Sequence, residues 1–568
     1  MATTKSPRML SPKRQESADL DPDCPTSPTE YKRFSSTTLG TTATFIADDE
    51  ESQVDGVQEP ARAKKQARKN KRTCCKCIRS WWRRLLFVIV VVGGIVAAIV
   101  WVILALMLKS TGGGDAAPVT TNELAQSAGR IADGSVPYKD AIDPILGVNP
   151  AKYLDQGCKL PQYTSADGQI YVQGSNGIKI PIAIKGVSWA GMETGNALPY
   201  GLWQNPLNGT TVYQMAAFLS RNNFNSVRLP LCVESILSDR KPNPELINAF
   251  ANKAIALDSY MNTLSSVVQA LGYRKISVLL DMHVLTLTEA GGSWTGDGMS
   301  ELSFLAAVDV LTTKLCNDAH WNVIGIDLKN SPYSATWGDG GSMDWSVGAA
   351  TVANRMLTKC PNWLAFVQGV VSSHTMTTDS NQAISYTDWW GGGLQDVAKT
   401  PLSLSIPNKI VYAPHYYPPS EYPQMYFVRG GLRDHDLIIG FLEYDNQTLW
   451  QRIKSTTNDM FGYLAQQKQA AIVLSAFGGI YTQDRFANFT GRRAIEFTMD
   501  VAAQTGFAGG YVWNLNPESQ YEYNPSNYKG LWNEGLVELD WITANGPYLA
   551  ALEKMDAMAH LQPWPCTP

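Results

Sequence analysis

Residues 321–338 read W-N-V-I-G-I-D-L-K-N-S-P-Y-S-A-T-W-G and combine a short apolar run with an abrupt polar loop. Val323–Leu328 is rich in β-branched residues, which is typical of a strand that is covered on both faces. Pro332 ends the run, because proline has no N–H to donate to a neighbouring strand. Proline also restricts the residue before it, so we expect Ser331 to be extended. The stretch predicts a fully buried strand followed at once by polar residues.

Similar apolar runs alternate with longer amphipathic segments from residue 155 onwards. This alternation indicates repeated βα units. Helical periodicity is clearest at residues 212–220, 247–269, 449–467 and 493–505. Eight strands joined by helices predict a (β/α)8 barrel with its working residues at the carboxyl ends of the strands. The eight runs are Ile182–Val187, Ser226–Leu229, Ile276–Leu280, Val323–Leu328, Leu364–Val370, Lys409–Ala413, Ala471–Leu474 and Gly510–Trp513.

The ends of these runs carry recurring motifs. They read G-V-S-W-A-G-M-E-T at 186–194, N-S-V-R-L-P at 225–230, L-D-M-H at 280–283, W-W-G-G at 389–392, Y-A-P-H-Y-Y at 412–417 and Y-V-W-N-L-N-P at 511–517. In this order, and with the loop at 329–332, they closely resemble glycoside hydrolase family 5, the cellulase-like retaining glycosidases. The resemblance covers roughly residues 180–545, and it implies a TIM barrel, the (β/α)8 fold.

The resemblance also implies a sugar site. Arg228 would steady the nucleophilic carboxylate, Asn330 would bind the sugar 2-hydroxyl, and Trp513 would form the floor of the site. Glu193 stays open between structural pairing and ligand contact. The substrate-binding residues expected from the resemblance are Trp189, Arg228, His283, Asn330, His415, Tyr417 and Trp513.

The catalytic carboxyl groups of the family do not occur at the matching positions. Retaining hydrolysis needs an acid/base and a nucleophile about 5–5.5 Å apart. The family acid/base position, in an Asn-Glu-Pro loop, holds Ser331, and the family nucleophile position, in a G-E-F-G-G motif, holds Ala476. A third glutamate, in a V-E-G motif, is replaced by Gln368. We therefore expect no intact catalytic residue.

Two functions fit these substitutions. The first is a hydrolysis-deficient protein that binds β-linked polysaccharide or oligosaccharide outside the cell. The alternative is an active O-glycosyl hydrolase or transglycosylase on β-linked cell-wall glucan or mannan, with relocated carboxylates such as Asp327, Asp339, Glu518 or Glu522. No metal or organic cofactor is expected, because no His/Cys/acid cluster has ligand spacing. A net charge of −4 gives no indication of nucleic-acid binding.

The first part of the chain predicts a membrane anchor. Residues 1–84 are polar, include Ser-Pro dipeptides that suit phosphorylation and cytoplasmic partners, and end in a basic run from Arg62 to Arg84. Leu85–Leu108 carries no charge and is long enough to span a bilayer. The basic flank places residues 1–84 in the cytoplasm. We expect a disordered tail (1–84), a transmembrane helix (85–108), a stalk (109–155) and the barrel (156–562), in a single-pass type II protein of the plasma membrane.

An extracellular barrel would permit disulfides and N-glycosylation. We expect Cys158 to pair with Cys566 and Cys316 with Cys360, which leaves Cys232 as a buried free thiol. Sequons begin at residues 208, 446 and 488.

Overall fold

The computed structural model describes residues 149–568, apart from positions 206, 379–380 and 518. The predicted tail, the predicted transmembrane helix at 85–108 and the predicted stalk up to residue 148 lie outside the described residues. Within the described part of the chain, no helix is both long and apolar enough to cross a bilayer.

Eight parallel strands form a closed ring. Neighbouring strands pair in chain order, and the ring closes where β11 pairs with β17, β17 with β18 and β18 with β4. Every predicted run overlaps one strand of this ring, which confirms the expected barrel. The strands are β4 Ile184–Ser188, β5 Ser226–Cys232, β6 Ser277–Val284, β7 Val323–Asp327, β8 Leu364–Val367, β11 Ile410–Tyr412, β17 Ala471–Phe477 and β18 Gly509–Val512. A short strand, β12 His415–Tyr416, continues from β11 and pairs with the carboxyl end of β17.

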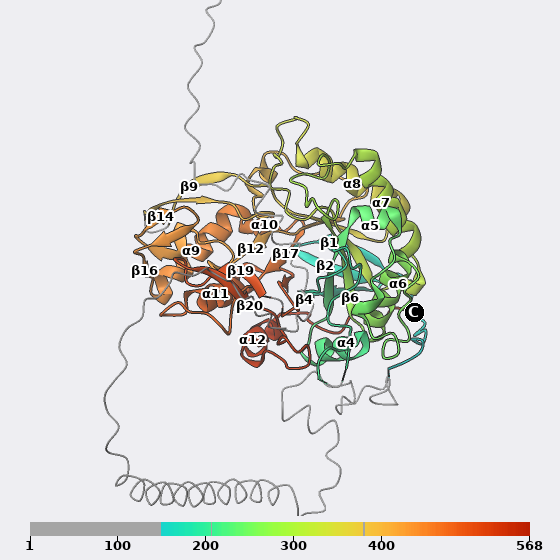
Figure 1. Ribbon diagram of the computed structural model, residues 1–568. Helices are drawn as coiled ribbons and strands as arrows, with labels where there is room; N and C mark the ends of the chain where they lie inside the picture. Colours follow the sequence, from blue (N-terminus) through green and yellow to red (C-terminus); the bar gives the residue numbers. More distant parts are fainter. Residues whose placement is uncertain (1–148, 206, 379–380, 518) are drawn as a thin grey trace, which may run out of the picture. The chain divides into compact units, whose positions relative to one another are not determined.

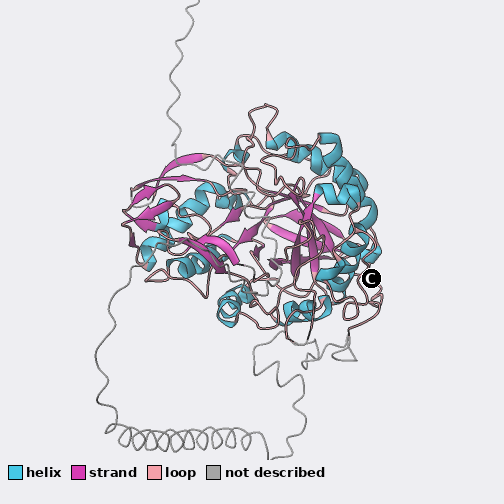
Figure 2. Ribbon diagram, in the orientation of Figure 1, coloured by secondary structure: helices cyan, strands magenta, loops and turns pink. Residues whose placement is uncertain are grey.

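Helices lie along the outside of the strands, as Figures 1 and 2 show for α5 to α8. The α-helices are α4 Val212–Arg221, α5 Val233–Ser238, α6 Tyr260–Tyr273, α7 Glu301–Leu315, α8 Trp345–Lys359, α9 Asn446–Thr457, α10 Leu464–Gln467, α11 Thr490–Thr505 and α12 Gly546–Leu552. Local sequence sets where they begin: Thr211 caps α4 in a reciprocal capping box with Gln214.

One predicted helix begins later than its sequence pattern indicated. Residues 247–259 form turns instead, and α6 starts only after Ser259, whose hydroxyl accepts from the Asn262 N–H. Asn248 donates from Nδ2 to the carbonyl of residue 204, and Asn252 donates from Nδ2 to the carbonyl of residue 202, which holds this segment against the loop after β4. The apolar spacing at 247–259 therefore reflects packing of a loop, and the predicted helix there was wrong.

Small antiparallel sheets surround the ring. The sheet β1 Gln162–Ala166, β2 Gln169–Gln173 and β3 Lys179–Ile182 lies at the amino-terminal end of the barrel, where the Tyr163 N–H donates to the carbonyl of Asn362 just before β8. At the opposite end, hairpins extend the loops. They are β9 Ser373–Thr377 with β10 Ala383–Thr387, β13 Val428–Arg429 with β16 Leu442–Glu443, β14 Leu432–Asp434 with β15 Leu437–Ile439, and β19 Ser519–Tyr523 with β20 Lys529–Asn533.

The disulfide pattern is the expected one. Cys158 is bonded to Cys566, which we call the terminal disulfide, and Cys316 to Cys360, which we call the lateral disulfide. Cys232 is a buried free cysteine.

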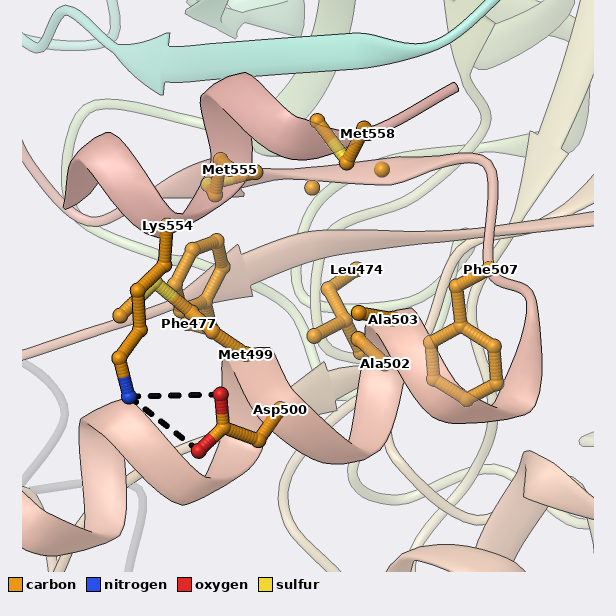
Figure 3. Close-up of a pocket in the computed structure, with 12 residues that line it drawn as sticks. Leu474, Phe477, Met499, Asp500, Ala502, Ala503, Phe507, Lys554, Met555 and Met558 are labelled. Atoms are coloured by element: carbon orange, nitrogen blue, oxygen red, sulfur yellow. Dashed lines mark hydrogen bonds and ion pairs between the residues drawn. The ribbon is translucent and has the colours of Figure 1, made fainter.

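A small apolar cavity of about 50 Å³ lies outside the barrel wall (Figure 3). It is lined by α11, by the 3-10 helix Glu553–Ala557, by the β17 side chains Leu474 and Phe477, and by Gly509 and Gly510 of β18. Successive side chains of a strand point to opposite faces. β17 departs from this alternation, because its pairing with β18 shifts register between Leu474 and Phe477, which both line the cavity. Ala476 pairs with His415 of β12 and is fully buried.

Candidate functional site

A buried charged network lies at the carboxyl ends of β5, β6 and β7. Arg228 on β5 is fully buried; its Nε donates to Asp327 Oδ2 at 3.0 Å and its Nη2 donates to Asn330 Oδ1 at 2.9 Å. Nη2 also lies 3.0 Å from Asp281 Oδ2 on β6. A buried charge is costly unless it is paired, and here two carboxyl groups pair with the one buried guanidinium. The structure brings Arg228 and Asn330 together as the resemblance implied.

Asp327 faces this network from β7 and is fully buried. Burial raises the pKa of its carboxyl to about 7; Arg228 opposes that rise and Asp281 adds to it. Gln368, just after β8, donates from Nε2 to Asp327 Oδ2 at 2.8 Å. The Gln368 amide therefore serves as a neutral donor to a carboxyl group that already has a raised pKa.

Ser331, at the family acid/base position, is held by its backbone. Its N–H donates to Gln368 Oε1 at 2.7 Å, so the amide of Gln368 is used at both ends. Its φ is +48°, in the left-handed region, and the expectation of an extended Ser331 was wrong. The hydrogen bond to Gln368 offsets the roughly 1 kcal/mol that this conformation costs a non-glycine residue. The hydroxyl points to the Trp390 carbonyl at 3.4 Å and carries no acidic proton.

His283 and Trp513 form a stacked pair at the mouth of the barrel. Their ring centroids are 5.7 Å apart and the planes differ by 3°. Asp281 Oδ2 lies 2.6 Å from His283 Nδ1, which orients the imidazole. Trp513 is only partly buried, so it keeps exposed ring surface, as a sugar floor needs.

His415 and Tyr417 reach the site from the sixth strand position. Their rings make an edge-on contact at 5.7 Å. His415 stands opposite Ala476 in the β12–β17 pair, and both are buried. Burial, and then Arg228, lower the pKa of His415 well below its usual value, so the imidazole is neutral.

Trp189 and Glu193, which follow β4, differ in how deeply they are buried. Trp189 is fully buried in the core and donates its indole N–H to the Tyr200 carbonyl, so it has no surface for a sugar, and its assignment to the groove was wrong. Glu193 is half-buried, accepts from the Gly191 N–H at 2.7 Å, and has a pKa raised by burial.

The acidic residues that could replace the missing catalytic glutamates differ in their burial and in their hydrogen-bond partners. Asp327 is committed to Arg228 and Gln368, and Asp339 is exposed and accepts from the Gly341 N–H. Glu522 on β19 is 1% exposed, and its carboxyl group faces that of Glu534. Glu518 lies outside the described residues.

The buried Glu522 and Glu534 form, with the partly exposed Glu421, a cluster that we call the carboxyl trio. Burial raises the pKa of all three carboxyl groups; that of Glu421 reaches about 8. Carboxyl groups that share a site hold their protons to higher pH because like charges repel. The trio is therefore a structural acid cluster, and within the described ranges no three His, Cys, Asp or Glu side chains are arranged to hold a metal ion.

Sequence reasoning missed the role of Asp281, which contacts both Arg228 and His283. A signal was present: Asp281 and His283 are two apart on a strand and so share one face.

The barrel and the polar network at its carboxyl-terminal end define the class of (β/α)8 barrels that gather polar side chains at the carboxyl ends of their strands. Solved structures agree in fold: the chain is similar to an endocellulase from Pyrococcus horikoshii crystallised with cellotetraose (TM-score 0.56, 26% identity, 70% of this chain and 99% of that one). It is equally similar to the catalytic domain of the major endoglucanase of Xanthomonas campestris pv. campestris (TM-score 0.55, 26% identity, 70% and 100%).

The family follows from the sequence match. The model of the cellulase family, glycosyl hydrolase family 5, matches residues 180–519, more than half of the chain, and the chain belongs to that family. An endoglucanase of Paenibacillus polymyxa is 26% identical over 376 residues, 64% of this chain and 80% of the relative. The major extracellular endoglucanase of Xanthomonas campestris is 29% identical, over 60% of this chain and 62% of that protein.

Proposed function

We propose that this chain is a hydrolysis-deficient member of family 5 that binds β-linked glucan chains. One observation carries the proposal: Arg228 still donates to Asp327 and Asn330, whereas the two family carboxyl positions hold Ser331 and Ala476. General acid–base catalysis contributes about 10²–10⁴-fold to a rate. The missing nucleophile removes the covalent intermediate itself, so the retaining route is closed.

The proposed ligand is a cello-oligosaccharide or a longer β-glucan chain. The partly exposed Trp513 ring, braced by the stacked His283, offers an apolar face for a sugar ring. Asn330, fixed by Arg228, offers a polar contact beside it. The cellotetraose in the related endocellulase supports this choice of ligand.

We propose that the protein is a single-pass type II protein of the plasma membrane that displays the barrel outside the cell. The charge-free run at 85–108 and its basic amino-terminal flank support this topology. Protease added to intact cells should then remove the barrel and spare residues 1–84. A barrel that survives external protease, while a known surface protein is cleaved, would refute the topology.

An active hydrolase is the second candidate, because the relatives are endoglucanases. It would need two carboxyl groups across the sugar, about 6.5–9.5 Å apart for inversion. Asp327 has a pKa that suits an acid, but it is fully buried and bonded to Arg228. For this reason we favour binding.

Glycan binding is tested by calorimetric titration of the full-length chain with cellotetraose. Trp513→Ala should weaken binding at least 10-fold, since it removes the stacking surface. Trp450→Ala is the matched control, because Trp450 lies on α9 beneath Lys454, away from the strand ends. Equal binding by both variants, or release of sugar from β-glucan by the unmodified chain, would overturn the proposal.

Restoration of the carboxyl groups tests the assignment of positions. The double variant Ser331→Glu with Ala476→Glu should hydrolyse an activated aryl β-cellobioside with retention, followed by NMR. Each single variant should do far less, because the two groups act as one unit. An unmodified chain as active as the double variant would show that the catalytic positions are misassigned.

A further inference from the structure

An exposed aromatic side chain occupies an unfavourable backbone conformation just before α11. Phe489 is 48% exposed, and its φ is +52°, in the left-handed region. A bulky residue rarely adopts this region, because its Cβ crowds the neighbouring carbonyl oxygen. Glycine adopts the same conformation without that cost. Packing within the protein therefore does not explain why a phenylalanine stands at this position.

One neighbour fixes the Phe489 ring and leaves much of it accessible. The Arg492 guanidinium lies over the ring, 4.6 Å from its centroid. Arg492 is itself held in place, because its Nε donates to the Tyr481 carbonyl and its Nη2 donates to the Thr482 carbonyl. The guanidinium can hold the ring by a cation–π interaction. The exposed part of the ring remains available to a second, apolar partner.

The residue before Phe489 carries an amide that can be modified. Asn488 is exposed and begins the sequon Asn-Phe-Thr, the acceptor pattern for N-glycosylation. Its backbone N–H donates to the Glu443 carboxylate at 2.9 Å, whereas its side-chain amide makes no hydrogen bond within the described part of the chain. The backbone is thus fixed, and a sugar on Asn488 Nδ2 would break no native hydrogen bond.

The other two sequons offer no comparable ring. Asn208 and Asn446 are also exposed, but the residues that follow them are Gly209 and Gln447. Among the three sequons, which all lie in the described part of the chain, the one at Asn488 alone has an exposed aromatic residue at its central position.

We propose that Asn488 is N-glycosylated and that the first sugar of the glycan packs on the exposed part of the Phe489 ring. The C–H face of a sugar ring is a flat apolar partner of the kind that an aromatic face accepts. This contact gives the exposed phenylalanine a role that its own domain does not supply. The proposal rests on the proposed extracellular location of the barrel, but it does not depend on glycan binding at Trp513.

Attachment requires a co-substrate, an oligosaccharide carried on a polyprenyl diphosphate. Asn488 Nδ2 forms a bond to the anomeric carbon of the first N-acetylglucosamine while the bond from that carbon to the phosphate oxygen breaks. The electron pair leaves with the diphosphate, and Nδ2 gives up one proton to the transferase. In the folded chain the Thr490 hydroxyl is buried and donates to Glu443 at 2.6 Å. Transfer therefore has to precede folding of this segment, and the finished fold has only to leave room for the glycan.

Occupancy of the site is tested by peptide mass spectrometry on the full-length chain purified from a eukaryotic host. We expect glycopeptides that carry the sugar on Asn488. An unmodified Asn488 in a chain that is modified at Asn208 or Asn446 overturns the glycan site and leaves the topology intact. A chain without sugar at any of the three sequons also overturns the site, and the protease experiment on intact cells then decides the topology.

Packing on Phe489 is tested by a double-mutant cycle in urea unfolding of the full-length chain. Asn488→Gln removes the glycan, whereas Phe489→Gly removes the ring, keeps the sequon and suits a positive φ. We expect Asn488→Gln to raise the unfolding equilibrium constant about fivefold when Phe489 is present and to have no effect in the Phe489→Gly background, since an aromatic contact contributes about that much. An endoglycosidase that leaves a single N-acetylglucosamine on Asn488 should preserve the stabilisation.

Asn208→Gln is the matched control, because it removes a glycan from a sequon without an exposed ring. Its effect on unfolding should be the same with Phe489 and with glycine at position 489. An Asn488→Gln effect that is equally large in both backgrounds would show that the glycan does not pack on Phe489. Loss of the stabilisation on trimming to one sugar would likewise overturn the assignment of the contact to the first sugar.

Discussion

Gln368→Glu should make stability depend on pH above about pH 7. In the unmodified protein the Gln368 amide donates to Asp327 at 2.8 Å and accepts from Ser331. A glutamate keeps the acceptor but sets a second carboxyl group against Asp327. Two charges at that distance would repel by about 6 kcal/mol at an effective dielectric constant of 20.

The pair avoids this repulsion by holding one proton. The unmodified Asp327 already holds a proton below its pKa of about 7, so between pH 5 and 7 the variant and the unmodified chain bind equal numbers of protons. Above pH 7 only the variant keeps its proton. A raised folded-state pKa gives stability that is present at low pH and lost as pH rises. The variant should therefore lose about 1.4 kcal/mol per pH unit relative to the unmodified chain, or about 2.7 kcal/mol between pH 7 and 9.

The assay is urea unfolding of both full-length chains at pH 6, 7.5 and 9. Gln368→Met is the matched control: it removes both hydrogen bonds and adds no titrating group. Loss of the Gln368 hydrogen bond raises the pKa of Asp327, so the penalty of this variant should grow above pH 7, but less steeply than that of Gln368→Glu. A Gln368→Glu penalty that stays constant from pH 6 to 9, or that grows below pH 7, would refute the assignment of the raised pKa to Asp327.

The remaining predictions concern the rest of the barrel. Replacing both cysteines of the terminal disulfide with Ala should lower the free energy of unfolding by about 6 kcal/mol, because the cross-link spans 408 residues. The same change at the lateral disulfide, which spans 44 residues, should lower it by about 4 kcal/mol. A larger loss at the lateral disulfide in urea titrations would contradict the chain-entropy argument. The carboxyl trio should make the protein less stable as pH rises from about 4.3 through about 8, because the glutamates of the unfolded chain lose their protons at lower pH than those of the folded chain. Glu534→Gln should make the melting temperature fall less steeply over this pH range. A pH dependence of the melting temperature that is the same in both proteins would count against shared protons at this site.

Much of the barrel could be predicted because burial on both faces forces continuous apolar runs, and all eight were visible. The polar residues at the strand ends were found because a parallel barrel brings those ends together. The geometry of the network around Arg228 could not be predicted from the sequence. The rotamer of Asp327, and the link that Gln368 makes between Asp327 and Ser331, depend on contacts across three strands. Trp189 was misplaced because an aromatic residue at a strand end has the same sequence pattern in a groove and in a core.

Ser331 and the segment 247–259 show a second limit. Local rules favour an extended residue before proline and a helix where apolar residues recur, yet hydrogen bonds to distant residues decided both. Hairpins such as β14–β15 were not predicted, because their strands are three residues long and show too little alternation.

The terminal disulfide also has a mechanical consequence. In the anchored chain that we propose, a pull on the stalk reaches the barrel at Cys158, four residues before β1 begins at Gln162. Without the covalent link, tension would peel β1 from β2 one hydrogen bond at a time. With it, part of the load passes to the last residues of the chain, where the buried Trp564 indole donates to the Tyr163 hydroxyl. Force on the tether is thus shared between both ends of the domain, and the ring that carries the candidate site is spared.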